Sequence, residues 1–452
     1  MVKHHISLAQ VQFHPHSFAD PDGRLFWLDG GLYRAISNEK TPFFAGLFED
    51  GTIPELVNRG LLVGSEPADL VLDGYGMVLR HVSVPFVSYP NEWCPGMLKD
   101  AALTYLDLLK ELLKKSLTLK DTHPWNLLFV GTRPVYVDLT SITTLKPHSA
   151  CPDQNKFCRY YLYPLILMSE GQERIARYLL PDYDGILPMD FSLLTGRANS
   201  PAKLATRFKS GLKRRVPERC RKPLRDIVSF MQSLIRKPSG ANAHLENLAR
   251  IRRQVEAVRL SPVPNPPDNL EPEMQRRLLE IVSQLAPASI LIIGAKTLWY
   301  PSLAARFGSR VVVFDKDSAY VEQLYRAGHD SNVEILPLVM DFTDPTPSRG
   351  LSNHVSIAAA DRFQCDLVVA IGLLNHLIQE RHLRFDQVAD GLIQFSKRWL
   401  ILDYIPAEIR EVSAGSPGQI REDLTRALLK RFRNVTMLQP ASATHTLLLC
   451  EK

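Results

Sequence analysis

The sequence predicts a two-part fold: a C-terminal α/β half built on a doubly wound parallel sheet, preceded by an N-terminal α+β half. The chain has 452 residues, whereas a single hydrophobic core stops growing at roughly 250–300 residues. From residue 271 onward, short apolar strands alternate with helix-length segments, which is the pattern of a parallel sheet covered by helices. Between the halves, the segment SPVPNPPDN (residues 261–269) contains four prolines, which block helix formation and favour an extended connector.

These observations divide the chain into three segments. We expect an α+β domain over residues 1–190, a basic helical connector with the Pro-rich linker over 191–268, and a Rossmann-like domain over 269–452. The hydrophobic content of 45% and the charged content of 23% are ordinary for a globular protein. No apolar run reaches the roughly 18 residues of a membrane span, and the N-terminus lacks a signal-peptide core. We therefore expect a cytoplasmic protein without a transmembrane segment.

The six cysteines are scattered along the chain, with no C-x-x-C pair and no histidine at zinc-finger spacing. We expect reduced, mostly buried thiols, and a metal site or a disulfide is the less favoured alternative.

A basic run lies inside the connector. Between Arg207 and Arg225 the chain carries nine Lys and Arg residues and a single acidic residue, Glu218. Clustered cations gain free energy by neutralising arrays of phosphates or carboxylates. The run therefore indicates a peripheral contact with anionic lipid, nucleic acid or a polyanionic glycan, and a solvated helical connector is the alternative.

The N-terminal half reads as a small β-rich part followed by a helical part. We expect a hairpin over residues 22–36 around Asp29-Gly30-Gly31, because glycine permits the positive φ angles of a tight turn. The following elements are a short helix over 54–62, a strand pair over 69–84 turning at Asp73-Gly74, a long amphipathic helix over 95–115, two strands separated by Gly131-Thr132, and mostly helices over 152–260.

The C-terminal half reads as a helix over 271–285 and seven strands. The strands are expected at residues 290–293, 311–315, 334–341, 365–372, 399–405, 434–438 and 444–450. Most of them are separated by helices, but no helix fits between the last two. We therefore expect the last two strands to form an antiparallel hairpin at one end of a parallel sheet.

Ligands of a doubly wound sheet bind at the carboxyl ends of its strands. The first strand ends in Gly294-Ala295, and the second ends in Asp315, where a carboxylate can accept hydrogen bonds from both hydroxyls of a ribose. The third ends in Asp341-Phe342, a position suited to the edge of an adenine ring.

The fourth strand carries Asp366 at its start and Asn375-His376 just beyond its end. Together with the ends of the first three strands, these positions favour S-adenosylmethionine (SAM) over NAD as the cofactor. The expected cofactor-binding residues are Gly294, Ala295, Asp315, Asp341, Phe342 and Asp366.

Several segments carry a resemblance to a known family. VVVFDKDSAYVEQLY, MDFTDPTPSRG and CDLVVAIGLLNHL in the C-terminal half, and PFVSYPNEW, LKDTHPWNLLF and RPVYVDLTSI in the N-terminal half, resemble bacterial class I SAM-dependent methyltransferases related to a nodulation protein. The similarity covers nearly the whole chain apart from the basic connector. It implies a class I methyltransferase sheet, SAM as the methyl donor, and methyl transfer as the activity.

The first loop departs from that family. Its pattern is D-x-G-x-x-x-G, whereas residues 292–298 read IIGAKTL and keep only Gly294. The missing carboxylate and glycine make weakened or lost SAM binding an alternative. Trp299 and Tyr300 either pack against the cofactor or form an aromatic core at a helix start. His376 is a candidate catalytic residue, and a hydrogen-bonded histidine at a helix start is the alternative.

The N-terminal half contains a second candidate site. DTHPWN (residues 121–126), followed after one strand by VDL (137–139), resembles the catalytic loop and metal-binding aspartate of protein kinases and small-molecule phosphotransferases. The resemblance implies a protein-kinase-like domain in which Asp121 accepts a substrate hydroxyl proton, while Asn126 and Asp138 hold Mg²⁺ with ATP.

Parts of a nucleotide site are missing from this half. No G-x-G-x-x-G loop is present, and no lysine occupies the usual phosphate-binding place. Arg34 is a candidate replacement, with Glu55 on the following helix as its partner, although arginine lacks the compact geometry of lysine.

Three functions follow as alternatives. The first is a SAM-dependent methyltransferase whose kinase-like half recognises the acceptor. The second is a bifunctional kinase and methyltransferase acting on a glycan or small molecule. The third is a non-catalytic scaffold with a degenerate SAM site. The sequence does not identify the methyl acceptor, and the basic connector slightly favours an anionic one.

Overall fold

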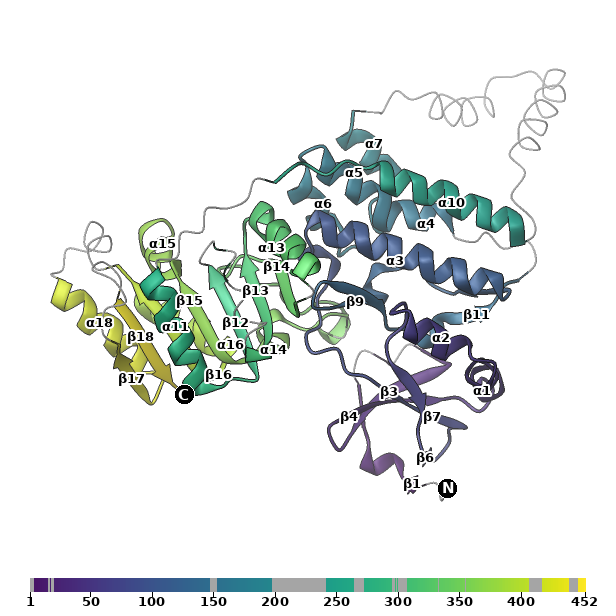
Figure 1. Cartoon of the computed structure of the whole chain (residues 1–452), viewed down its shortest axis with the longest axis horizontal. Helices are drawn as coiled ribbons and strands as arrows, with labels where there is room; N and C mark the ends of the chain where they lie inside the picture. The colour runs from purple at the N-terminus through teal and green to yellow at the C-terminus, as the bar shows by residue number, and fades with distance from the viewer. Residues whose placement is uncertain are drawn as a thin grey trace. The chain divides into compact units, whose positions relative to one another are not determined.

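The structure is a computed structural model, and it describes residues 4–14, 17, 20–146, 153–196, 241–263, 272–294, 297, 299, 307–331, 333–353, 355–405, 417–438 and 446–452. These residues form two compact units (Figure 1). The first unit comprises Met1–Met97, Leu127–Val137 and Pro262–Lys452. The second comprises Leu98–Asn126 and Asp138–Ser261. The basic run 207–225 lies outside the described residues.

A seven-stranded sheet is the centre of the C-terminal region. Its strands are β12 (Ser289–Gly294), β13 (Arg310–Asp315), β14 (Ile335–Val339), β15 (Cys365–Ile371), β16 (Ser396–Tyr404), β17 (Asn434–Met437) and β18 (Thr446–Glu451). The spatial order is β14-β13-β12-β15-β16-β18-β17. The first five strands are parallel, whereas β18 lies antiparallel between β16 and β17. The predicted doubly wound sheet and its final antiparallel hairpin are confirmed.

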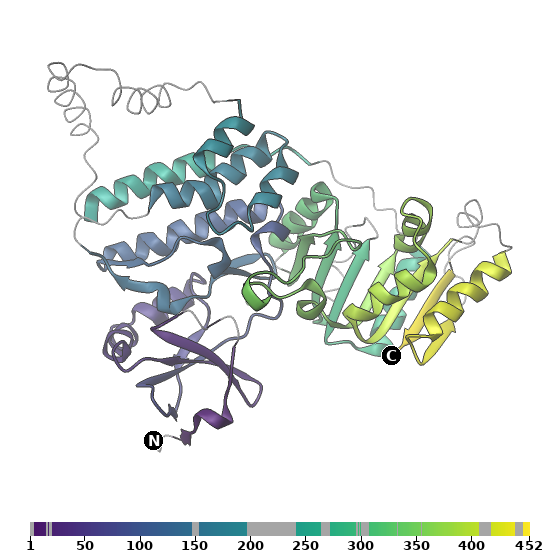
Figure 2. The same cartoon turned by 180° about the vertical axis from the view of Figure 1, so that it is seen from behind.

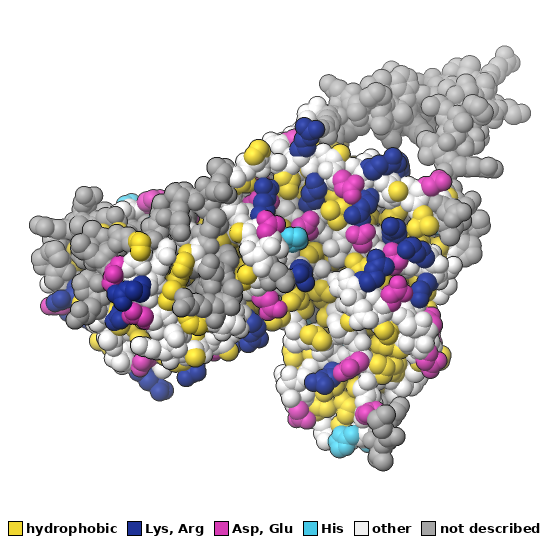
Figure 3. Space-filling view, in the orientation of Figure 1, with side chains coloured by type: hydrophobic (Ala, Val, Ile, Leu, Met, Phe, Trp, Pro, Cys, Tyr) yellow, Lys and Arg dark blue, Asp and Glu magenta, His cyan; other side chains and the backbone are white. Residues whose placement is uncertain are grey.

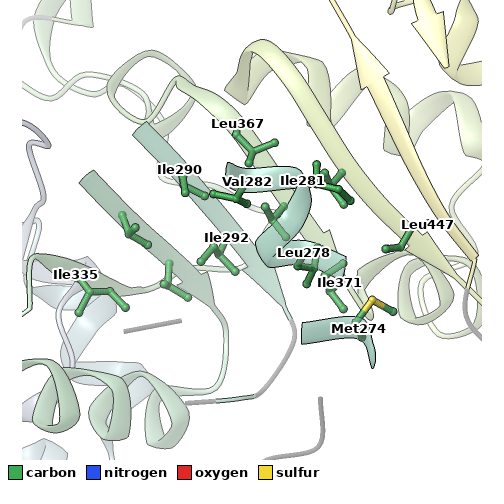
Figure 4. Close-up of a cluster of buried hydrophobic side chains, with 14 of the residues drawn as sticks. Met274, Leu278, Ile281, Val282, Ile290, Ile292, Ile335, Leu367, Ile371 and Leu447 are labelled. Carbon is green, nitrogen blue, oxygen red and sulfur yellow. The ribbon is translucent and has the colours of Figure 1, made fainter. Parts of the chain in front are cut away.

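One face of this sheet is covered by α11 (Pro272–Leu285) and α13 (Ser318–Ser331). The apolar residues of α11 recur with helical spacing at Met274, Leu278, Ile281 and Val282, so they form one stripe along the helix. Figure 4 shows this stripe packed over the strand residues Ile290, Ile292 and Leu367. Because β-strand side chains alternate between faces, every second residue of β12 contributes to this core.

The opposite face of the sheet carries α14 (Ala359–Arg362), α16 (Phe385–Phe395) and α18 (Pro417–Leu429), which Figure 2 turns toward the viewer. Phe314 of β13 contacts Phe363 at 4.9 Å and Phe395 at 5.9 Å between ring centroids, with the rings edge to face. Such aromatic pairs add stabilisation beyond simple burial. The short helix α15 (Leu373–Gln379) follows β15 directly, and Gly372 is its N-cap residue.

The N-terminal part of the first unit is a five-stranded antiparallel sheet. Its order is β2 (Gln12–Phe13), β3 (Gly23–Leu28), β4 (Gly31–Ile36), β7 (Met77–His81) and β5 (Ser65–Pro67). The predicted hairpin over 22–36 is confirmed, and Asp29 and Gly30 both adopt positive φ, as a tight hairpin turn requires. The short helices α1 (Thr41–Glu49) and α2 (Thr52–Asn58) follow β4.

The predicted strand pair over 69–84 is wrong in its pairing. Both strands form, and Gly74 makes the turn between them with a φ of 86°. However, β6 (Leu70–Leu72) pairs with β1 (His4–Ile6), while β7 pairs with β4 on one side and β5 on the other. Both edges of β7 are therefore occupied, so no edge is left for a ladder with β6. The later hairpin of β9 (Leu127–Val130) and β10 (Arg133–Tyr136) forms as predicted.

The second unit is mostly helical. The helix α3 (Pro95–Lys114) belongs to this unit from residue 98 onward. The other elements are β8 (Leu117–Leu119), β11 (Ile142–Thr144), α4 (Gln154–Phe157), a π-helical turn at Cys158–Leu162, α5 (Tyr163–Ser169), α6 (Glu173–Leu179), α7 (Pro188–Leu194) and α10 (Ala241–Ala257). Arg252 of α10 pairs with Asp107 of α3 and with Glu256. Figure 3 shows cationic and anionic side chains interspersed over the described surface in this view.

Two expectations from the sequence concern membrane-spanning helices and the state of the cysteine thiols. Within the described part of the chain, no helix is long and apolar enough to cross a membrane. The four described cysteines, Cys94, Cys158, Cys365 and Cys450, are buried free thiols. Burial raises the pKa of Cys365 and of Cys450 to about 12, so both thiols stay protonated at neutral pH.

Candidate functional site

The carboxyl ends of β12, β13 and β14 meet at one edge of the sheet. Ile293 pairs with Phe314, so Gly294 and Asp315 are the next residues on neighbouring strands. Asp315 pairs with Val339, and its carbonyl accepts a hydrogen bond from Met340 at 2.9 Å, which brings Asp341 to the same edge. The structure therefore brings together three of the predicted cofactor residues, one from each strand end.

Gly294 is a position where the backbone requires glycine. Its φ is 83°, and a Cβ atom added there would lie 2.9 Å from the carbonyl oxygen of Ile371 on the neighbouring strand. Any side chain would be both conformationally strained and too close to that backbone. Glycine is therefore required here by the close packing of the end of β12 against the end of β15. Ala295, which was also predicted to bind the cofactor, lies outside the described residues.

Asp315 is a carboxylate at the end of a strand whose preceding four residues are apolar and buried. Its side chain is buried, and its Oδ1 accepts a hydrogen bond from the backbone N–H of Asp317 at 2.7 Å. Burying an ionised group costs free energy, which hydrogen bonds must offset. One backbone bond fixes the orientation of the carboxylate at the edge where a ribose would lie.

Asp341 is held in its ionised form. Burial disfavours its charge, but hydrogen bonds from Thr343 and the positive charges of Arg381 and Lys316 outweigh burial, so the pKa of Asp341 is lowered. Arg381 pairs with it at 3.1 Å. The neighbouring Phe342 packs its ring against α16, where a Cβ at Gly391 would lie 2.7 Å from it. Its contact with a cofactor stays a prediction.

Asp366 does not join these residues. It lies at the start of β15, and its carboxylate accepts a hydrogen bond from Ala288 N at 3.0 Å, just before β12 begins. Gly294 pairs with Ile371 at the other end of the same strand. Five residues of strand separate the two ends, which is about 17 Å at 3.3 Å per residue. The expected cofactor role of Asp366 is corrected: it ties two strands together at the amino edge.

His376 lies on α15 with partners on both ring nitrogens. Lys316, the residue after Asp315, places its Nζ 2.9 Å from His376 Nε2, and Glu380 Oε1 lies 3.0 Å from Nδ1. An ammonium group has no acceptor, so in this contact Lys316 is the donor. Lys316 and Glu380 together orient the imidazole ring.

Asp403 is a buried carboxylate that the sequence analysis missed. It lies in β16, is 1% exposed, and accepts a hydrogen bond from Gly372 N at 2.6 Å. Nearby, Asn375 exchanges two hydrogen bonds with the backbone of Ile405. These bonds fix the start of α15 against β16. The signal in the sequence was an aspartate inside the apolar run WLILDYI, the same pattern that identified Asp315.

The first loop is anchored by Tyr320. Its hydroxyl donates to the carbonyl of Thr297 at 2.9 Å, and burial raises the pKa of this tyrosine, so the hydroxyl keeps its proton. Trp299 packs against the hydrophobic core between α11 and the sheet, which supports the aromatic-core alternative for this residue. Tyr300 lies outside the described residues.

The second candidate site lies in the second unit. Ser141 accepts a hydrogen bond from Lys120 N through its carbonyl at 2.9 Å, and its Oγ accepts one from Asp121 N at 3.3 Å. Asp138 begins the same short turn, and Ser141 N donates to its carbonyl at 3.1 Å. The loop that carries Asp121 is thus tied to the turn that carries Asp138. Asn126 ends the 3-10 turn Pro124–Asn126 that closes this loop.

His123 shapes the loop between Asp121 and Asn126. Its N–H donates to Asp121 Oδ1 at 3.0 Å, and its Nδ1 accepts from Trp125 N at 3.3 Å. Burial lowers the pKa of His123 to about 4, against an opposing effect of Asp121, so the ring is neutral at pH 7. Its ring lies 4.6 Å from that of Tyr160. The two hydrogen bonds fix the conformation of residues 121–125, and Asp121 lies at the start of this loop.

Arg34 lies on β4 of the first unit with a buried side chain. Its NH1 lies 3.3 Å from Asp20 Oδ2. Glu55 on α2 is more than half exposed and lies 4.0 Å from Arg59. A direct pair between Arg34 and Glu55 stays a prediction.

The fold and the carboxyl-edge residues together define a class. Counted in chain order, the strands run 3-2-1-4-5-7-6 with the seventh antiparallel, which is the class I methyltransferase sheet that the resemblance implied. Ligands of doubly wound sheets bind at the carboxyl edge, and Gly294, Asp315 and Asp341 lie at that edge of this sheet.

The sequence is similar to the nodulation protein NoeA of Rhizobium meliloti (strain 1021). The two are 24% identical over 440 residues, which cover 90% of this chain and 87% of the relative. The expected resemblance to a nodulation protein is therefore confirmed. No family model matches the chain.

Two solved structures show partial likeness. The bifunctional kinase-methyltransferase WbdD is 13% identical, with 39% of each chain covered and a TM-score of 0.30. The N-methyltransferase NodS from Bradyrhizobium japonicum WM9 is 19% identical, with 41% of this chain and 96% of that chain covered and a TM-score of 0.29. The matched region therefore spans about two fifths of WbdD. The fold assignment rests on the strand order itself.

Proposed function

We propose that the protein is a SAM-dependent methyltransferase. The observation that carries the proposal is the buried Asp315 carboxylate, which lies beside the bare backbone of Gly294 at the carboxyl edge of the sheet. A buried carboxylate at this place has a use if it accepts hydrogen bonds from the two hydroxyls of a ribose. The backbone of Gly294 would border the rest of the nucleoside.

The residues at this edge would divide the binding of SAM between them. Asp315 would hold the ribose, and Asp341 with Phe342 would border the adenine. When bound, SAM supplies an electrophilic methyl group on a sulfonium. The protein must then bring the acceptor atom in line with that methyl group and exclude water, which by itself accelerates such a transfer strongly. No side chain needs to bond to the methyl group.

The three interacting side chains Glu380, His376 and Lys316 would act on the methyl acceptor. The Nε2 atom of His376 lies 2.9 Å from the Lys316 ammonium. If an acceptor displaces the Lys316 ammonium, Nε2 becomes free to take a proton from an acceptor hydroxyl, and Glu380 would stabilise the imidazolium that forms. The displaced Lys316 would attract an anionic acceptor. The acceptor is an unidentified small molecule, glycan or protein.

Isothermal titration with SAM tests the proposal. We expect wild-type protein to bind SAM with one-to-one stoichiometry, and we expect Asp315→Asn to weaken binding at least tenfold because the ribose hydroxyls lose a charged acceptor. Asp366→Asn, at the amino edge of the same sheet, is the matched control and should bind normally. Absence of SAM binding in the wild-type protein would favour a scaffold with a degenerate site.

A second candidate function is phosphotransfer in the N-terminal half. The observation that favours it is the pair of hydrogen bonds from Lys120 and Asp121 to Ser141, which ties the Asp121 loop to the Asp138 turn. In a kinase-like domain this arrangement would let Asp121 accept the proton of a substrate hydroxyl. Asn126 and Asp138 supply oxygen ligands, which Mg²⁺ prefers, together with the phosphates of ATP.

Titration with Mg-ATP tests this second candidate. Binding that is lost in Asp138→Asn and retained in Asp121→Asn would support a nucleotide site, because only the former substitution removes the negative charge of a metal ligand. Phosphate release that depends on Asp121 would then establish turnover. ATP consumption that survives Asp138→Asn would contradict the candidate, and the N-terminal half would be left with acceptor recognition.

A further inference from the structure

A buried ion pair joins the segment 85–96 to the C-terminal sheet domain within the first unit. Arg362 of α14 approaches Glu92 with both guanidinium nitrogens, at 2.5 Å and 3.0 Å from the two carboxylate oxygens. The side chains are 2% and 1% exposed. A bidentate pair of this kind fixes both the distance and the orientation of its partners.

Each of the three guanidinium nitrogens of Arg362 donates at least one hydrogen bond. Its Nε donates to the carbonyl of Ile357 at 2.8 Å, and its NH1 also donates to the carbonyl of Val87. Its guanidinium lies 4.1 Å over the ring of Tyr89. Buried charges are tolerated only when such bonds replace the lost water. These bonds therefore fix the segment 85–96 against α14, and we call this contact the joint.

The joint holds the end of the loop that begins at Asp341. This loop runs over residues 342–358 and is closed on itself by a hydrogen bond from Ala359 N to the carbonyl of Thr346 at 2.8 Å. At its far end, Ile357 N donates to the hydroxyl of Tyr89 at 2.9 Å. Since Asp341 starts the loop and Arg362 follows it, residues 89–92 restrain the backbone on the adenine side of the proposed site.

A second contact of the same segment reaches the helix that follows Asp315. Gly96 N donates to Glu322 of α13 at 2.7 Å, and Glu322 is buried and paired with Arg326 at 2.8 Å. A Cβ at Gly96 would lie 2.5 Å from the Glu322 carboxylate, so a side chain at residue 96 would require that carboxylate to shift. The segment thus contacts the elements that follow both Asp315 and Asp341.

We propose that Tyr89, Glu92 and Gly96 are positioning residues for the methyl-donor site, so that the N-terminal half completes the methyltransferase domain. The inference rests on the proposed function for its ligand. The joint holds the 342–358 loop and α13 in place, and these elements set the positions of the Asp341 and Asp315 carboxylates. Loosening the joint should therefore weaken SAM binding although no joint residue touches the ligand edge.

The test uses full-length Glu92→Gln and Tyr89→Phe proteins. Two readouts are measured: amide hydrogen exchange of residues 342–358 without ligand, and the dissociation constant for SAM. Glu66→Gln is the matched control, because Glu66 lies in the same half and pairs with Arg80 on an exposed surface. We expect both joint variants to speed exchange in 342–358 at least tenfold and to raise the SAM dissociation constant at least fivefold, with no change for Glu66→Gln.

The two readouts separate the inference from the proposed function. Wild-type protein that binds no SAM contradicts the proposed function, and the exchange measurement without ligand still decides whether the joint orders the loop. Unchanged exchange and unchanged SAM affinity in a folded Glu92→Gln protein would overturn the inference. If Glu92→Gln does not fold, Tyr89→Phe decides in the same way, because it removes a single hydroxyl and keeps the buried pair.

Discussion

Two aspartates of the C-terminal sheet, Asp315 and Asp366, differ in what they can do because their strands present them at opposite edges. Both interrupt or end an apolar run, so the sequence marks both as carboxylates with a cost of burial. Asp315 ends its strand and lies at the carboxyl edge, whereas Asp366 begins its strand and bonds to Ala288 N. The position of each aspartate within its strand distinguishes the two, and the sequence contains this information.

Other site residues could not be found from local patterns. The contact between Lys316 and His376 joins residues 60 positions apart, and it depends on the register of β13 and β15 about the central β12. The Asp403 bond to Gly372 likewise needs the pairing of β15 with β16. Sequence patterns identify which strands end in polar residues, but only the register shows which of these residues meet.

Acid sensitivity is predicted at His81, a buried residue of β7. Burial, and to a lesser degree the charge of Arg34, lowers the pKa of His81 to about 3. The unfolded chain then binds a proton near pH 6.5 that the folded protein excludes, so this contribution to stability is present above pH 6.5 and is lost as the pH falls toward 3. The loss amounts to about 1.4 kcal/mol per pH unit.

Urea unfolding at several pH values measures this effect. His81→Gln should flatten the decline in the free energy of unfolding between pH 6.5 and pH 4, while the exposed control His329→Gln should keep the wild-type slope. A His81→Gln slope equal to that of the wild-type protein would show that His81 does not resist protonation.

At the scale of elements, helical periodicity was a reliable signal, whereas one of the expected strand pairings was wrong. The helix expected over 271–285 is α11 at Pro272–Leu285, because its apolar stripe can be read directly from the spacing. The strands β6 and β7 were also expected, but their partners were wrong. A turn signal such as Asp73-Gly74 reports that the chain reverses, whereas pairing depends on which distant strands compete for each edge.

The packing of α11 gives a second prediction. Leu278 lies in the middle of the stripe and is 1% exposed against the sheet, as Figure 4 shows. Leu278→Ala should lower the free energy of unfolding by about 2–5 kcal/mol, because the apolar contacts are lost and a cavity remains. Gln284→Ala, at an exposed position of the same helix, should change it by less than about 0.5 kcal/mol. Equal effects in urea unfolding would contradict this packing.

At the scale of the whole molecule, the chain is interleaved between its two compact units. Residues 1–97 and 127–137 belong with the C-terminal sheet domain, and the helical unit takes the segments between them. The expected division into 1–190, 191–268 and 269–452 assigns one continuous segment to each part. The interleaving depends on contacts between residues far apart in sequence, so a division of this kind does not contain it. The consequence is functional: the two candidate sites lie in different units, but the methyl-donor site shares its unit with the N-terminal sheet.

This arrangement predicts that the two candidate sites can be separated by substitution. Asp138→Asn, in the second unit, should leave the SAM dissociation constant within twofold of the wild-type value in isothermal titration. Glu92→Gln, in the first unit, should change it. A loss of SAM binding in a folded Asp138→Asn protein would contradict the assignment of the sites to separate units.

The most direct measurement is a crystal structure of the full-length protein with S-adenosylhomocysteine. We predict that the ligand lies at the carboxyl edge of β12, β13 and β14, with both ribose hydroxyls donating to the Asp315 carboxylate at about 2.5–2.8 Å and the adenine beside Asp341 and Phe342. A ligand bound at another place, or an edge that stays empty at saturating ligand while the protein is folded, would contradict the proposed methyl-donor site.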